Sequence, residues 1–298
     1  MSSYYGRPVL KEPVWQPEIP WYFFTGGLGG ASSVLSLAAR VSGHELLAQR
    51  SIQIASAADA VSPALLISDL GRPERFLNML RVFKVTSPMS VGSWILAYSS
   101  AASSVSAFLN TIGRLPRVAD LARTASAVSG APLAVYTATL ISDTAIPVWH
   151  EARRELPFLF GSSAVASAGA AAAIAVPPAE AGPARRLAVG GVLLENALFQ
   201  VMEKRLGLIG EPYSTAEAGR YKKLAKACTL GGTALLGSLG RRSRLAAATG
   251  GALVLAGEAA MRWSVFKAGF QSARDPKYTV EPQRARADAA RAGSRPRR

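Results

Sequence analysis

Long apolar runs separated by clusters of Lys and Arg are the feature that most constrains this chain. The run between Lys84 and Arg114 contains no charged residue, and the run between Arg50 and Asp69 contains one, Asp59. A helix needs roughly 20 apolar residues to cross a bilayer, and each strong run supplies them. The pattern predicts an all-α polytopic membrane bundle of about eight transmembrane helices, arranged as two four-helix bundles.

The runs follow one another along most of the chain, with basic residues between them. The seventh run is the weakest prediction, because its neutral stretch begins only after Lys226 and the preceding lysines must extend to the membrane interface. A transmembrane barrel would show short alternating segments instead. The expected spans lie at about 18–40, 50–69, 84–114, 124–150, 155–180, 184–203, 218–240 and 243–267.

Polar segments flank these runs and predict three parts of the chain. Residues 1–19 contain three prolines and several aromatic residues, which favours an extended N-terminal arm that binds a partner or the membrane interface. Residues 20–270 form the transmembrane domain. Residues 271–298 are rich in Arg, Ala, Pro and Asp, a composition typical of a disordered, solvated tail.

Composition supports a membrane protein and argues against a nucleic-acid-binding one. Only 18% of residues are charged, whereas soluble domains average about 25%. The net charge is +15, but the basic residues stand at the ends of apolar runs and not on a face with interleaved aromatics. Eight helices place both termini on one side, which carries more Lys and Arg, so we expect both termini in the cytoplasm and the bundle in the inner membrane.

Cysteine and histidine are too scarce to hold a redox centre. Cys228 is the single cysteine, and His44 and His150 are the two histidines, neither of them in the middle of an apolar run. We therefore expect no iron–sulfur cluster and no haem in this chain. Any electrons that pass through it must come from a partner and leave on a diffusible carrier.

Several short motifs lie near the ends of the first four runs. They are Trp21-Tyr22-Phe23-Phe24 followed by paired glycines that include Gly26 and Gly30, Ser68-Asp69-Leu70-Gly71-Arg72-Pro73-Glu74-Arg75-Phe76, Ser87-Pro88-Met89-Ser90, Gly92-Ser93-Trp94, Tyr136-Thr137-Ala138, and Pro147 with Trp149. Together they resemble the NrfD/PsrC family of integral membrane subunits of polysulfide-reductase-like complexes, over most of residues 15–165. The sequence departs from some members at Ile19 and Tyr22, where they have Asn and His, and at Ala138, where Gly is usual.

This resemblance implies a subunit that is not catalytic alone. Such subunits bind a membrane quinone, menaquinone or ubiquinone, among their first four helices. The resemblance also implies two partners: a four-cluster iron–sulfur subunit, and a molybdopterin catalytic subunit that exchanges electrons with it.

Tyr136 and Asp143 are the candidate catalytic residues. They are seven positions apart, hence about two turns apart on one helical face. Reduction of a quinone needs a hydrogen-bond donor for its carbonyl and two protons, which a Tyr hydroxyl and a carboxyl can supply. A structural Tyr–Asp contact is the alternative.

Four further residues are candidates for binding the quinone, because the topology places them at one membrane face. They are Tyr22, Asp69, Arg72 and His150. Asp69 and Arg72 either frame the quinone headgroup and the docked partner or form an ion pair that holds the loop.

Asp59, Glu195 and Glu258 lie inside apolar runs, where an ionisable group costs about 2.5–3.5 kcal/mol on insertion scales. They either form a proton path or serve as hydrogen-bonding groups between helices. Gly26 and Gly30 form a GxxxG pair that favours close helix packing.

Three functions remain open at this stage. The first is a quinone-reactive membrane subunit of an oxidoreductase complex. The second is a proton channel or transporter, favoured by the buried acids, although no internal repeat is evident. The third is a passive anchor that holds a soluble enzyme at the membrane.

Overall fold

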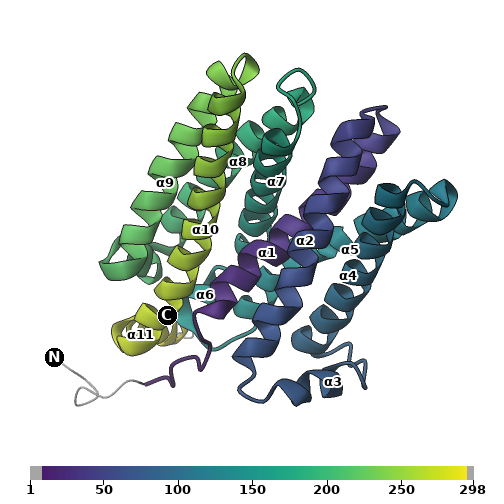
Figure 1. Ribbon diagram of the computed structural model, residues 1–298. Helices are drawn as coiled ribbons and strands as arrows, with labels where there is room; N and C mark the ends of the chain where they lie inside the picture. The colour runs from purple at the N-terminus through teal and green to yellow at the C-terminus, as the bar shows by residue number, and fades with distance from the viewer. Residues whose placement is uncertain (1–8, 294–298) are drawn as a thin grey trace.

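Eight long helices form the body of the protein in the computed structural model, which describes residues 9–293. Successive long helices run in opposite directions (Figure 1). They are α1 (Glu18–Val41), α2 (Glu45–Asp69), α4 (Pro88–Ile112), α5 (Pro116–Ser142), α7 (Leu156–Ala175), α8 (Gly182–Leu206), α9 (Ala216–Gly237) and α10 (Arg244–Arg274). The described residues contain no strand, and the predicted all-α bundle of about eight long helices is confirmed.

Length and composition alone single out three of the described helices as able to cross a membrane: α2, α5 and α7. The other five are long enough, since even α9, with 22 residues, spans about 33 Å at the rise of an α-helix. Their polar content lowers their hydropathy: α4 is rich in Ser, and α8 and α9 carry Lys, Arg and Glu. Many of these polar side chains point into the bundle, as the buried serines of α4 do.

The long helices form two groups of four, as the sequence predicted. Helices α1, α2, α4 and α5 make the first group, and α7 to α10 make the second (Figure 1). Helix α1 joins them, because it packs against α2 and α5 of its own group and against α7 and α10 of the other.

Close packing of α1 against α5 depends on two glycines. A Cβ on Gly30 would overlap the backbone carbonyl of Gly130, and a Cβ on Gly130 would overlap Gly30 in turn. Gly26 behaves differently, because its added Cβ would meet only the Tyr22 ring at an ordinary 3.8 Å. Of the GxxxG pair in the sequence, Gly30 therefore makes the close helix contact.

One end of the bundle carries most of the irregular structure, and we call it the polar end. It comprises the arm at residues 9–17, the turn η1 (Pro73–Arg75), and helices α3 (Phe76–Met79), α6 (Pro147–Glu151), η2 (Gly207–Ser214) and α11 (Lys277–Gly293) (Figure 1). Arg274 at the end of α10 pairs with Glu12 of the arm at 3.0 Å. Both ends of the described chain therefore lie on one side of the bundle. The opposite end has shorter turns, one of which contains η3 (Leu239–Arg241).

The basic segment that we expected to be disordered contains a helix, α11. Its first turns bury Tyr278 and Val280 against the polar end. Lys277 pairs with Glu211 at 2.8 Å, and this hydrogen bond holds the pKa of the exposed Glu211 carboxyl below its usual value. Composition did not indicate this helix, because its few buried residues, such as Tyr278 and Val280, stand among many solvated Arg and Ala residues.

Because Gly30 contacts the α5 backbone and Gly26 does not, replacing each with alanine is predicted to change the stability of the protein differently. Gly30→Ala forces α1 and α5 apart and is expected to destabilise the protein by about 1–3 kcal/mol, as overpacking usually does. Gly26→Ala, the matched control, is expected to leave stability unchanged. Thermal unfolding of both variants in detergent measures the difference, and equal melting temperatures would contradict the α1–α5 packing described here.

Candidate functional site

The Asp-Leu-Gly-Arg-Pro element forms the turn that leaves α2. Gly71 has φ +63°, in the left-handed region that favours glycine. Arg72 is extended, as a residue before proline prefers, and Pro73 opens the turn η1. The motif therefore has a structural reason, which is to turn the chain sharply at the polar end.

Asp69 fastens the N-terminal arm to this turn. Its Oδ1 accepts a hydrogen bond from the backbone N–H of Gln16 at 2.8 Å. The neighbouring Trp15 stacks on Trp149, with ring centroids 5.4 Å apart. Arg72 is exposed, and no ion pair joins it to Asp69 among the residues that the structure describes. Of the two alternatives for these residues, the ion pair does not form among the described residues, and Asp69 contacts the arm instead.

Tyr136 and Asp143 line the same pocket at the polar end. The pocket has a volume of about 370 Å³ and lies between the end of α5, the start of α4 and the loop before α4. Tyr136 is buried within α5, whereas Asp143 follows the last residue of that helix and is exposed. Pro88, Val91 and Pro132 supply apolar walls. The pocket therefore combines a buried hydroxyl with a carboxylate that reaches solvent.

Gly92 makes room for the Tyr136 ring. A Cβ at Gly92 would coincide with the ring and hydroxyl of Tyr136, so a larger residue there would displace it. Tyr22 of α1 is 1% exposed and lies close enough to Tyr136 and Asp59 to interact with both electrostatically. Tyr22 therefore lies near the pocket tyrosine.

His150 lies apart from Tyr136 and Asp143. It lines a second hollow of about 250 Å³, between α6 and α11, together with Glu151, Tyr278 and Arg286. We expected one continuous helix from about residue 124 to His150, but α5 ends at Ser142 and α6 is a separate short helix. Pro147 opens α6, and this break separates the histidine from the pocket tyrosine.

Asp59 is fully buried in the first group of helices. Its Oδ2 accepts hydrogen bonds from Ser99 at 3.1 Å and Ser103 at 2.8 Å, both on α4. Its Oδ1 points at Gly29 of α1, where any side chain would collide with it, and has no hydrogen-bond partner within the described protein. Asp59 therefore links α2 to α4 through one of its oxygens and leaves the other without a partner among the described residues.

Glu195 and Glu258 form a second acidic site, in the other group of helices. Their carboxyl groups lie close enough to interact electrostatically, and Glu258 Oε2 accepts a hydrogen bond from Ser163 at 2.5 Å. The structure therefore divides the three buried acids of the predicted proton path into two places. Asp59 faces Gly29 of α1, whereas the glutamates lie among α7, α8 and α10.

Arg262 is a buried cation near this second site, and it was missed in the sequence. It is 1% exposed, donates from Nη2 to the carbonyl of Phe160 at 3.0 Å, and places its guanidinium 3.7 Å from the Phe160 ring centroid. It also interacts electrostatically with Glu195 and Glu258. The sequence did contain a signal for this arginine: it lies four residues after Glu258, a spacing that places the two side chains on one face of a helix.

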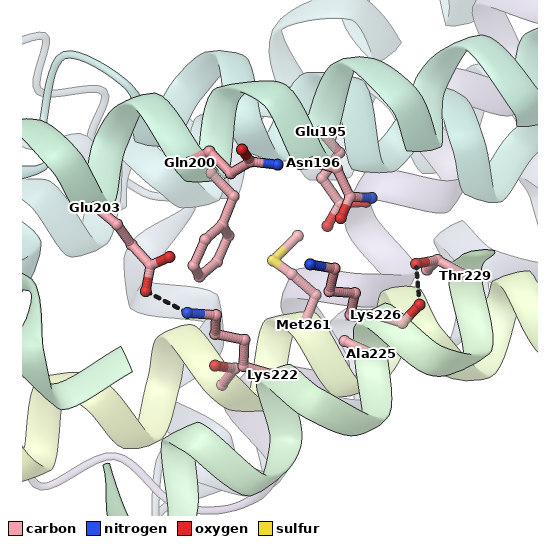
Figure 2. Close-up of a pocket in the computed structure, with 11 residues that line it drawn as sticks. Glu195, Asn196, Gln200, Glu203, Lys222, Ala225, Lys226, Thr229 and Met261 are labelled. Atoms are coloured by element: carbon pink, nitrogen blue, oxygen red, sulfur yellow. Dashed lines mark hydrogen bonds and ion pairs between the residues drawn. The ribbon is translucent and has the colours of Figure 1, made fainter. Parts of the chain in front are cut away.

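A polar pocket leads from the second acidic site towards the polar end. It lies between α8, α9 and α10 and has a volume of about 130 Å³ (Figure 2). Figure 2 shows Glu195 on α8 across from Lys226 and Met261, and Glu203 bonded to Lys222 nearer the polar end. Two of the lysines that made the seventh run a weak prediction, Lys222 and Lys226, thus line this polar pocket.

Fold and site together define a polytopic helical membrane protein with a pocket at its polar end and two buried acidic sites. The family model described as polysulphide reductase, NrfD, matches residues 9–208, well over half of the 298-residue chain. The chain belongs to the NrfD polysulphide reductase family, whose members are membrane subunits of quinone-linked oxidoreductase complexes. A comparison with curated proteins finds no match.

The buried arginine yields a stability prediction. Arg262→Met removes a buried cation near Glu195 and Glu258 and leaves the Phe160 carbonyl without its donor, so it is expected to destabilise the protein by about 1–3 kcal/mol. Combining it with Glu258→Gln removes one buried acid and is expected to recover part of this loss. Thermal unfolding in detergent measures both variants. If the double variant lost as much stability as the two single variants together, Arg262 and Glu258 would not be energetically coupled.

Proposed function

We propose that this protein is the quinone-reactive membrane subunit of a molybdopterin and iron–sulfur oxidoreductase complex. Electrons pass between an iron–sulfur partner at the polar end and menaquinone or ubiquinone in the membrane. The chain supplies the quinone pocket and the proton-bearing groups, while the catalytic chemistry belongs to the partner.

One observation carries the proposal: Tyr136 and Asp143 line a single pocket at the polar end. The Tyr136 hydroxyl donates a hydrogen bond to a quinone carbonyl and stabilises the charge that develops on its oxygen. Asp143 is exposed and exchanges the protons that quinone reduction consumes or quinol oxidation releases. Tyr22 of α1 is buried near Tyr136.

The polar end supports the docking of a soluble partner. The Trp15–Trp149 stack and the hydrogen bond from Gln16 to Asp69 fix the arm across this end, and α11 covers α6. Arg72 and His150 lie exposed on the same surface. In this proposal the partner is a four-cluster iron–sulfur subunit, which connects to a molybdopterin catalytic subunit, and the polar end faces the cytoplasm from the inner membrane.

Conservative changes in the pocket test the assignment. Tyr136→Phe removes the hydroxyl and Asp143→Asn removes the titrating group, and each is expected to slow quinone turnover by the purified complex about 100-fold, in the range of general acid–base catalysis. Tyr98→Phe on α4 is the matched control, because Tyr98 is exposed and lies outside the pocket. Reduction of a soluble dye by the catalytic partner is expected to stay unchanged in all three variants.

Two results would overturn this proposal. One is unchanged quinone turnover in the double variant Tyr136→Phe/Asp143→Asn. The other is a wild-type complex that reduces soluble dyes but never quinone, which would make the chain a passive anchor.

A proton-conducting role for the buried acids is a second candidate function, favoured by their unsatisfied oxygens. Asp59 Oδ1, Glu195 Oε2 and Glu258 Oε1 are buried and have no hydrogen-bond partner within the described protein. In this role Glu195 exchanges protons through the polar pocket that Figure 2 shows, and Asp59 does so from the first group of helices.

Proton release in liposomes tests Asp59. Asp59→Asn keeps an oxygen acceptor for Ser99 and Ser103, so the fold and quinone turnover are expected to persist. Proton movement coupled to turnover, measured with a pH-sensitive dye, is expected to fall about tenfold. The control Ser99→Ala/Ser103→Ala retains the acid and removes its hydrogen bonds. If the Ser99→Ala/Ser103→Ala variant loses proton movement while Asp59→Asn keeps it, Asp59 carries no proton and serves only as the hydrogen-bonding link between α2 and α4.

A further inference from the structure

A wide apolar groove runs along the outside of the molecule, where the two groups of helices meet. Its walls come from α1, α5, α7 and α8, and its volume is about 720 Å³. Small residues such as Gly161 and Gly190 form its floor, and Phe158 and Leu198 line its deep end. No residue of the quinone pocket contributes except Val135, so the groove is a separate feature.

The length of the groove matches one acyl chain. Its lining on α8 extends from Arg186 to Leu198, which is about 18 Å along an α-helix. One leaflet of the hydrocarbon core is roughly 15 Å deep, half of the whole. A chain that enters at the Arg186 end therefore reaches about the bilayer midplane.

A basic hollow adjoins the groove at the end opposite the polar end. It has a volume of about 490 Å³ and is lined by Arg185, Arg186 and Arg241, with Gly190 and Gly237 beside them. Arg186 and Gly190 line both the hollow and the groove. The two spaces therefore lie side by side, with charge at the membrane surface and apolar walls below it.

The positive charge of the hollow is not neutralised by the described protein. Arg185 lies close enough to Arg186 and Arg241 to be repelled by both. Its Nη1 donates to the carbonyl of Pro178 at 2.6 Å, which orients the guanidinium without neutralising it. No ion pair joins any of the three to a carboxylate among the residues that the structure describes.

We infer that this composite site binds one anionic phospholipid, with its phosphate in the arginine hollow and one acyl chain in the groove between the helix groups. Guanidinium groups bind phosphate oxygens through paired hydrogen bonds. Basic pockets between transmembrane helices are known places for anionic headgroups. The lipid fills a gap between α5 and α8 that the protein leaves open, and it acts as a wedge between the two groups.

Native mass spectrometry of the full chain, with phosphatidylglycerol or phosphatidylcholine added, tests the headgroup part. Wild type is expected to retain one phosphatidylglycerol in preference to phosphatidylcholine. Arg186→Gln/Arg241→Gln is expected to reduce this preference about 25-fold, since each arginine at a membrane surface contributes roughly fivefold. Arg114→Gln/Arg117→Gln removes the same charge from another turn at this end and is expected to leave the preference intact. An equal loss in both double variants would overturn the site.

Filling the groove tests the acyl-chain part. A Cβ added at Gly190 meets no protein atom within 4 Å, so Gly190→Ile is expected to fill the space where hollow and groove meet without disturbing the fold. Gly231→Ile on α9 is the matched control, since Gly231 is equally open and lies outside the groove. Retained phospholipid is expected to fall at least fivefold in Gly190→Ile only. Loss of co-purified quinone with phospholipid retained would show a quinone tail in the groove and overturn the assignment.

Discussion

The close approach of α1 to its neighbours is the constraint on which the rest of the structure depends. Gly30 meets the backbone of Gly130 on α5, Gly29 faces Asp59 on α2, and Gly27 faces Arg262 on α10. Within a membrane, helices gain little from apolar burial alone, so close backbone packing and polar contacts must hold them together. By omitting side chains on several faces, α1 packs against both groups of helices and makes them one body.

The same small residues explain how polar groups are accommodated inside the bundle. Gly29 leaves space for the Asp59 carboxylate, and Gly92 leaves space for the Tyr136 ring. The serines of α4 and α7 supply the hydrogen bonds that Asp59 and Glu258 require. A buried acid is tolerated where such donors or a cation meet it, which is the part that Arg262 plays.

The two ends of the molecule differ in kind. The polar end carries extra helices, an arm held by aromatic stacking, and the pocket of Tyr136, all suited to a docked partner and a redox carrier. The opposite end has short turns and unneutralised arginines, which suit lipid phosphates. Because the number of long helices in the described chain is even, the arm before α1 and helix α11 after α10 lie at the same end and add to the polar end.

The sequence by itself determined the class, the helix number and the polar end. Apolar runs of membrane-spanning length and motifs such as Asp-Leu-Gly-Arg-Pro are local properties, which the chain displays without folding. It also marked Tyr136 and Asp143, because their spacing places them on one side of a helix. Only the tertiary structure decided that His150 lies in another hollow, that Asp59 and Glu258 occupy different helix groups, and that Arg262 lies buried near the glutamates. Those facts depend on which helices are neighbours and how each is rotated, and hydropathy along the chain carries no record of either.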